Sequence, residues 1–323
     1  MNNLYASVDI KGGLGNQLFQ IAYIIYFLRL SKKNKIKRRL VFKYEEDVGN
    51  EINTFLNTPR KPYWNTLFKG LFRVLSADDF KYIPLNILHC EKTDHLFTEP
   101  PCNDNKNNIL FKGGYQTFKY FDDTLREKMI SIVYSNEDIM YPAYYKYRDI
   151  LDYFGNNTKD DDMVSLHIRR KDYLSHTNYN YNLDMNYYKE ALQIANKKKV
   201  VVFSDDIEWC IGNFNDYANS ENIYNIYYVS AKIFKEDEVG IKDDIEFILM
   251  SMFKNNIIAN SYFSLWASFI SYYNSKIIIA PKRWYSYDGC NYYEELYHKY
   301  ITHIILIYIY IYIYIYIYNI LLL

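Results

Sequence analysis

Residues 164–173 read Val-Ser-Leu-His-Ile-Arg-Arg-Lys-Asp-Tyr. Apolar and polar side chains alternate through the first half of this stretch, which predicts a β-strand with one packed face. His167 and Arg169 should then lie on the same side, at the point where the chain leaves the sheet. A planar guanidinium suits a phosphate or carboxylate partner, so this strand end is a candidate anion site. The alternative is a surface ion pair of the arginines with Asp172 or with the acidic run 160–162.

The chain after residue 162 alternates strand patterns with helical patterns. We expect strands over 163–168, 199–203, 227–230, 256–259 and 276–280, and helices through Trp209 and over 185–196, 243–253 and 265–273. This order predicts an α/β fold with a parallel sheet covered by helices on both faces. Ligands of such sheets bind beyond the carboxyl ends of the strands. Polar residues follow three of these strands: His167 with Arg169, Ser204 with Asp205, and Asn260 with Ser261.

The first part of the chain has a strand–turn–helix pattern of its own. A strand is expected over 5–10, a glycine turn over 11–17 and an apolar helix over 17–31, followed by strands at 40–44 and 109–111 and a helix start at 115–121. Glycines allow a ligand to approach the backbone, and the helix start offers N–H groups to an anion. Leu18 replaces the third glycine of a dinucleotide fingerprint, which disfavours a nicotinamide cofactor.

Apolar periodicity breaks between residues 153 and 162, in a segment of glycine, asparagine and aspartate. We therefore predict one domain over residues 1–155, a second over 156–302 and a separate tail over 303–323. The tail alternates Ile and Tyr strictly from 307 to 318, which is a strand period and favours a translated simple repeat outside the catalytic fold. Membrane contact through residues 304–323 is the alternative, since this uncharged segment is long enough to span a bilayer.

Composition excludes several classes of partner. Lys+Arg and Asp+Glu number 38 each, so no global basic excess favours nucleic acid, and the basic run 32–39 is expected to be a solvated turn. The four cysteines lie far apart without metal-ligand spacing, which predicts reduced thiols.

The first strand begins too early to leave room for a signal peptide. These features predict a cytoplasmic protein without a metal site.

Four sequence blocks, in order, resemble the α-1,2-fucosyltransferases of glycosyltransferase family 11. They comprise residues 12–20, 167–173, 203–206 with Trp209, and 249–251 with 260–267. The second block is similar to the His-x-Arg-Arg-x-Asp-Tyr motif of this family, which other fucosyltransferases share in looser form. Three positions depart from the family pattern: Phe253, Asn255 and Leu265. The region 50–108 is weakly patterned and carries none of the four blocks.

The resemblance implies a GT-B-like architecture with two facing, Rossmann-like α/β domains. GDP-fucose would bind mainly to the second domain, and a galactose-containing glycan acceptor would face the first. Transfer would invert the anomeric centre, form an α-1,2 linkage and need no metal. A metal-dependent GT-A enzyme would use an Asp-x-Asp motif, but the acidic run 160–162 precedes its strand and so lies at the wrong end of the sheet.

Within this scheme the expected catalytic residues are Arg169, His167 and Asp172. Arg169 would hold the β-phosphate, because fixed cations must stabilise the departing diphosphate where no metal does so. His167 would help to hold the diphosphate or the nucleoside. Arg170 faces the other way on the strand period and is expected to tie to Asp172 or to a neighbouring helix. Asp172 or His176 would take the acceptor proton.

Eight residues are expected to bind the donor. Asp205 would accept hydrogen bonds from guanine N1 and N2, and Ser261 and Ser264 would cap phosphate oxygens at a helix start, with plain helix capping as the alternative. The full set is Gly13, Gly15, Asn16, Arg170, Asp205, Asn260, Ser261 and Ser264.

Two other functions remain open at this level. One is a fucosyltransferase of another linkage, such as α-1,6. The other is a catalytically inactive protein that binds a nucleotide sugar. Products of a transfer assay separate the two from each other and from an α-1,2 enzyme.

Overall fold

The computed structural model describes residues 4–46, 48, 60–90, 96–155, 157–221, 225–273, 276–286, 296 and 304–307. The chain divides into two compact units, Met1–Met140 with Glu294–His298 and Tyr141–Tyr293 with Lys299–Leu323. Each unit contains a parallel β-sheet. The predicted α/β, GT-B-like class with two parallel-sheet units is confirmed.

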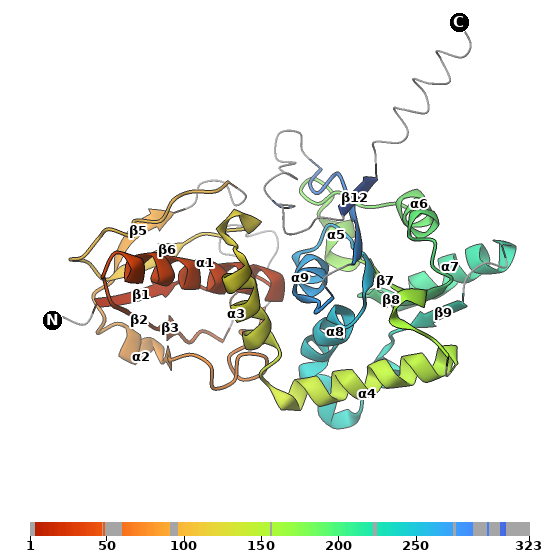
Figure 1. The fold of residues 1–323 in the computed structure, drawn as a ribbon, viewed down its shortest axis with the longest axis horizontal. Helices are drawn as coiled ribbons and strands as arrows, with labels where there is room; N and C mark the ends of the chain where they lie inside the picture. Colours follow the sequence, from red (N-terminus) through yellow and green to blue (C-terminus); the bar gives the residue numbers. More distant parts are fainter. Residues whose placement is uncertain are drawn as a thin grey trace, which may run out of the picture. The chain divides into compact units, whose positions relative to one another are not determined.

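The first unit is built on a four-stranded sheet of order β2-β1-β6-β5 (Figure 1). The strands are β1 (Leu4–Val8), β2 (Arg38–Leu40), β5 (Asn86–Cys90) and β6 (Ile109–Lys112). All neighbouring pairs are parallel. The expected strands at 5–10 and 109–111 are therefore confirmed as β1 and β6, with β1 ending two residues early.

Helix α1 (Leu14–Lys33) covers this sheet and is buried on most of its surface. Tyr23 stacks on Tyr115, with 3.7 Å between ring centroids, and meets Phe111 edge to face at 5.1 Å. The predicted helix over 17–31 is confirmed, but it begins at Leu14 because Gly13 already serves as the N-cap residue. The glycine turn therefore feeds directly into the helix.

Two expectations for the first unit are wrong in detail. The strand expected at 40–44 is divided, because β3 (Phe42–Lys43) leaves the main sheet and pairs with β4 (Val74–Leu75) beside the short helix α2 (Ala77–Phe80). The helix start expected at 115–121 is a short 3-10 helix over Phe118–Tyr120. Tyr115 has a left-handed φ of 53°, which prevents a continuous α-helix through this segment.

Two helices of more than ten residues were absent from the predicted elements: α3 (Asp123–Val133) and α4 (Glu137–Phe154). Asp122 caps α3 by accepting a hydrogen bond from the Leu125 N–H at 2.8 Å. Helix α4 contains Pro142, which lacks an N–H group and conceals the helical pattern. The division between the units falls at residues 140 and 141, inside α4, whereas the predicted boundary lies at 155 and 156.

The second unit contains a six-stranded sheet of order β12-β11-β10-β7-β8-β9, with every neighbouring pair parallel. Its strands are β7 (Met163–Ile168), β8 (Lys199–Ser204), β9 (Asn225–Tyr228), β10 (Asn255–Ile257), β11 (Ile277–Pro281) and β12 (Ile304–Ile307). The five predicted strands are confirmed within a few residues. β7 is central and all six of its residues are buried, which corrects the expectation of one packed face.

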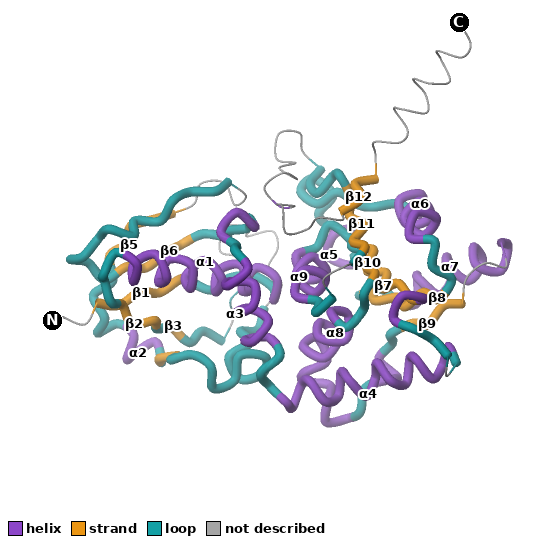
Figure 2. The backbone as a smooth tube through the Cα atoms, in the orientation of Figure 1, coloured by secondary structure: helices purple, strands orange, loops and turns teal. Residues whose placement is uncertain are grey.

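Helices cover both faces of this sheet (Figure 2). Val164, Leu166 and Ile168 pack toward α6 (Met185–Ala195) and α7 (Ile207–Glu221). On the opposite face, His167 stacks against Phe263 of α9 (Tyr262–Ile270), and Phe263 in turn meets Phe247 of α8 (Lys242–Ser251). A short helix, α5 (Lys171–Ser175), follows β7 directly.

The segment that was predicted as a separate tail begins inside the second sheet. Residues 304–307 form β12, which pairs with β11 from Ile278–Ile304 to Pro281–Ile307. This differs from the predicted start of the tail at residue 303. Most of the Ile-Tyr repeat, residues 308–318, lies outside the described residues. Within the described helices, none combines the length and the hydropathy that crossing a bilayer requires.

Candidate active site

The strand order of the second unit reverses between β7 and β10. From β7 the chain proceeds through β8 to β9 on one side, and then returns to β10 and β11 on the other. Such a reversal leaves a crevice at the carboxyl ends of the two strands, where α/β sheets bind ligands. Arg169 and Asn260 follow β7 and β10 at this edge, and Asp205 follows the adjacent β8. The three polar strand ends singled out from the sequence therefore share one edge of the sheet.

Arg169 lies between two carboxylates. Its Nη2 is 2.7 Å from Asp172 Oδ1, and its Nη1 is 3.1 Å from Asp205 Oδ2. Burial alone would lower the pKa of Arg169, but the charges of Asp205 and Asp172 raise it, so the guanidinium is firmly cationic. A guanidinium has five N–H donors. Two of them serve these ion pairs, and no hydrogen bond from the other three is found within the described residues.

His167 is a neutral imidazole in this environment. Its side chain lies parallel to the Phe263 ring, with 5.7 Å between centroids, and the residue is 6% exposed. Burial and the nearby charge of Arg169 lower the pKa of His167 to about 3. Within the described part of the chain, its Nδ1 has no hydrogen-bond partner. A buried ring nitrogen without a partner is unfavourable, so a ligand that pairs with it would relieve that cost.

Arg170 points away from Arg169 and toward α7. Its Nε donates to Asp206 Oδ2 at 3.0 Å, and its guanidinium lies 3.6 Å from the centre of the Trp209 ring. The expected tie to a neighbouring helix is confirmed, with Asp206 as the anionic partner instead of Asp172. Asp205 accepts the Arg170 backbone N–H at 2.9 Å through Oδ1. Both oxygens of Asp205 thus face the segment that follows β7, which gives this carboxylate a positioning role.

The third strand end is held by buried polar contacts. Asn260 Nδ2 donates to the carbonyl oxygens of Tyr181 at 2.8 Å and Trp284 at 2.7 Å, and the Asn260 carbonyl accepts from the Tyr173 hydroxyl at 2.8 Å. The Asn260 side chain therefore ties loops together, whereas donor binding was expected of it.

The two serines of α9 differ from each other. Ser264 is fully buried, and its hydroxyl donates to the Ser261 carbonyl at 3.1 Å, which differs from the expected phosphate contact. Ser261 is the N-cap residue, but its hydroxyl makes no capping bond within the described helix. Of the two predicted phosphate ligands, Ser261 is the one whose hydroxyl the helix leaves unused.

Gly13, Gly15 and Asn16 belong to the first unit, at the start of α1. Gly12 before them has a φ of +81°, a conformation that strains any residue with a Cβ, and a Cβ there would also crowd the Asn16 side chain, so this position favours glycine. Asn16 Oδ1 accepts from Gln116 Nε2 at 2.7 Å. Contacts within the first unit therefore fix the conformation of the glycine turn, independently of any ligand.

Comparison with protein-family models matches residues 107–301 to "Glycosyl transferase family 11". The match covers more than half of the chain, including every residue of the cluster around Arg169. The chain belongs to glycosyl transferase family 11.

Two relatives of this family 11 protein come from Escherichia coli. The O-antigen biosynthesis glycosyltransferase WbnK is 28% identical over 86% of this chain and 94% of its own length. An alpha-1,2-colitosyltransferase is 27% identical over 90% of this chain and 96% of its own length. Among solved structures, the fucosyltransferase NodZ from Bradyrhizobium is 10% identical over 84% of this chain and 94% of that chain, with a TM-score of 0.49.

Sequence reasoning missed one ionisable residue of this glycosyltransferase, Glu246 on α8. Burial raises its pKa to about 7; Asp243 and Asp205 add to the rise, while Lys242 opposes it. Glu246 shares a helix face with Leu249 and Met250, three and four residues further on, which are both fully buried. A carboxylate on an otherwise apolar helix face was the signal that could have revealed it. In the described ranges, no three His, Cys, Asp or Glu side chains are grouped as metal ligands.

Replacing Glu246 by Gln should stabilise the protein more at high pH than at low pH. A carboxyl whose folded pKa is raised costs no stability below its unfolded pKa near 4.5, and stability falls as the pH rises toward 7. The gain of Glu246→Gln over wild type should therefore grow by about 2 kcal/mol between pH 5 and pH 8. Urea unfolding at both values measures it, with the exposed Glu127→Gln on α3 as the matched control. An equal gain at both pH values would refute the raised pKa.

Proposed function

We propose that this glycosyltransferase transfers fucose from GDP-fucose to a hydroxyl of a galactoside, in α-1,2 linkage, with inversion and without a metal. The donor and the acceptor class rest on the resemblance of the four sequence blocks to α-1,2-fucosyltransferases. One relative is named for α-1,2 transfer of colitose, which supports the linkage but concerns another sugar. The observation that carries the proposal is the cationic Arg169 beside His167, whose Nδ1 has no partner among the described residues, where the strand order of the sheet reverses between β7 and β10.

The chemistry asks the site to stabilise a departing diphosphate. Bond cleavage gives the sugar oxocarbenium character while negative charge grows on the leaving group. Arg169 supplies N–H donors to that charge, and the unused Ser261 hydroxyl and the start of α9 are placed to assist. His167 is neutral, so it contributes a hydrogen bond and no charge.

The charges of the cluster limit how the donor can bind. Two guanidinium groups, on Arg169 and Arg170, face three carboxylates, on Asp172, Asp205 and Asp206. The cluster therefore has no excess of positive charge, and a diphosphate must share Arg169 with its carboxylate partners. We assign Asp172 to orienting Arg169, because its Oδ1 lies 2.7 Å from the Arg169 guanidinium. His176, whose Nδ1 lies 2.7 Å from the Asp172 carbonyl oxygen, is the alternative base.

A transfer assay tests the proposal. The full chain is incubated with GDP-fucose and lactose, GDP release is followed, and the product linkage is read by NMR. We expect acceptor-dependent GDP release, a fucose α-1,2-linked to galactose, and equal rates with and without EDTA. Binding of GDP-fucose without turnover would make the protein an inactive binder, and a 1,6-linked product would overturn the linkage. Preference for a colitose donor over GDP-fucose would overturn the assigned sugar.

A further inference from the structure

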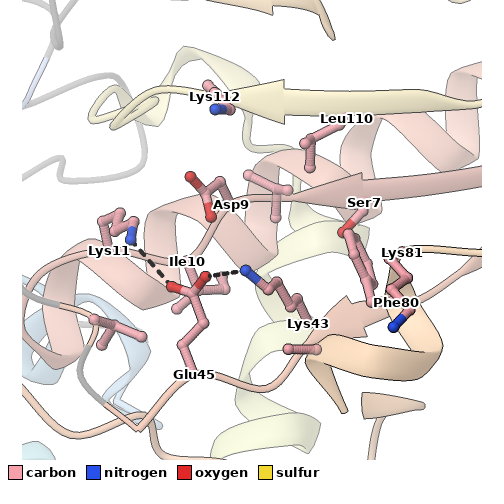
Figure 3. A pocket seen from close by; sticks show the side chains of 13 residues that line it. Ser7, Asp9, Ile10, Lys11, Lys43, Glu45, Phe80, Lys81, Leu110 and Lys112 are labelled. Carbon is pink, nitrogen blue, oxygen red and sulfur yellow. Dashed lines mark hydrogen bonds and ion pairs between the residues drawn. The ribbon is translucent and has the colours of Figure 1, made fainter. Parts of the chain in front are cut away.

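The first unit contains a pocket that the proposed donor chemistry does not use. It has a volume of about 360 Å³ and lies beyond the carboxyl ends of β1 and β6, with α2 on one side (Figure 3). This is at the small end of the range for ligand pockets. Polar residues from three strands and their loops line it, namely Ser7, Asp9, Lys11, Lys43, Glu45 and Lys112.

One carboxylate of this pocket is already satisfied. Glu45 Oε1 lies 2.7 Å from Lys43 Nζ, and Glu45 Oε2 lies 3.1 Å from Lys11 Nζ, as the dashed lines of Figure 3 show. Burial alone would raise the pKa of Glu45, but the hydrogen bonds from the two lysines lower it. Glu45 is therefore ionised, and it holds the two ammonium groups at the pocket wall.

Two donors in the same pocket have no acceptor among the residues that the structure describes. Ser7 is 1% exposed, and its hydroxyl has no hydrogen-bond partner within the described ranges, although it lies among the lining side chains in Figure 3. Lys112, at the end of β6, is half-buried and forms no ion pair with any residue that the structure describes. Because both groups can donate, the partner that would satisfy them is an acceptor.

The charge of the lining points the same way. Four lysines, Lys11, Lys43, Lys81 and Lys112, face two carboxylates, those of Asp9 and Glu45. Lys81 also lies 3.0 Å from Asp78, which is outside the pocket, so an excess of one positive charge remains when Asp78 is counted. Apolar side chains, including Ile10 and Phe80, complete the wall. An oxygen-rich anion with an apolar face fits this combination better than a bare inorganic ion.

We propose that this pocket binds an anionic monosaccharide unit, its charge carried by a carboxylate or a phosphate group. This rests on the proposed function for its biological meaning: the unit would belong to the acceptor glycan, making acidic oligosaccharides the substrate class. Lys112 and the Lys11–Lys43 pair meet the anionic group, and Ser7 donates to it or to a ring hydroxyl.

Direct binding to the full chain tests the pocket without reference to transfer. Galacturonate, galactose 6-phosphate and galactose are titrated separately and followed by ligand-observed NMR. At least one anionic sugar should bind about tenfold tighter than galactose, and the comparison of the two identifies the anionic group. Lys112→Met and Ser7→Ala should each weaken that binding about three- to tenfold, whereas Lys128→Met, an exposed lysine on α3, should not.

Three outcomes would overturn the proposal: equal binding of all three sugars, binding unchanged in Lys112→Met, or displacement of the anionic sugar by GDP alone. Thermal unfolding of each variant verifies that the fold is intact. Transfer to lactose without binding of anionic sugars would refute the pocket and leave the proposed function standing. Binding of anionic sugars without any transfer would support the pocket and refute the proposed function.

Discussion

Arg169→Ala should reduce fucose transfer at least about a hundredfold, mainly in kcat, because in the proposed function it removes the fixed cation that would face the growing charge of the diphosphate. Its guanidinium is held by Asp172 at 2.7 Å and Asp205 at 3.1 Å, so it is oriented before the donor arrives. Steady-state kinetics with GDP-fucose and lactose measure the loss. Arg169→Lys keeps the charge but cannot form bidentate hydrogen bonds, and it should recover only a small part of the rate.

Loss of Arg169 also leaves Asp172 and Asp205 without their shared partner, so stability must be separated from chemistry. Urea unfolding of Arg169→Ala and of the double variant Arg169→Ala/Asp205→Asn separates the two effects. The double variant removes the Asp205 carboxylate, which Arg169→Ala alone leaves without its cation. The exposed Arg39→Ala on β2 is the matched control and should keep wild-type rates. A folded Arg169→Ala protein with near wild-type kcat would refute the assigned role.

Lys146→Met should lower the free energy of unfolding by about 3–5 kcal/mol, because it leaves a buried carboxylate without its cation. Lys146 Nζ on α4 lies 2.6 Å from Glu238 Oε2, and both side chains are less than 10% exposed. Lys146 also lies 5.1 Å from the Phe234 ring centre. Equilibrium unfolding in urea measures the change.

A hydrophobic pair should restore much of this stability, as Lys146→Met/Glu238→Leu removes both charges together. The exposed pair Lys69–Asp138 in the first unit, at 3.1 Å, is the control, and Lys69→Met there should cost less than about 1 kcal/mol. A similar decrease in the free energy of unfolding at the two sites would show that burial does not strengthen the contribution of the Lys146–Glu238 pair to stability.

The second sheet could be read from the sequence because strand periodicity is local. Val164, Leu166 and Ile168 alternate with polar residues, and the parallel order follows from the helices between the strands. Helix α4 could not be read in the same way. Pro142 interrupts its hydrogen-bonding pattern, and tertiary packing of the rest of the helix outweighs that local cost.

The sequence predicted which residues belong to the candidate site, but it did not predict which of their side chains are in contact. His167, Arg169 and Asp205 are each visible as polar residues at strand ends, whereas nothing local shows that Arg169 lies between two carboxylates. Asn260 was expected at the donor, yet its amide holds two backbone carbonyls from distant loops. Glu246 was missed because its raised pKa depends on burial in α8 and on Asp205, forty-one positions away in sequence numbering.

The sequence by itself determined the alternation of strands and helices, the three polar strand ends and the resemblance to family 11, because each is a property of neighbouring residues. Only the tertiary structure decided that His167 is neutral, that Arg170 stacks on Trp209 and that the buried Ser7 has no hydrogen-bond partner among the residues described. Protonation, ion pairing and burial depend on distances between groups far apart in the chain, and folding alone sets those distances.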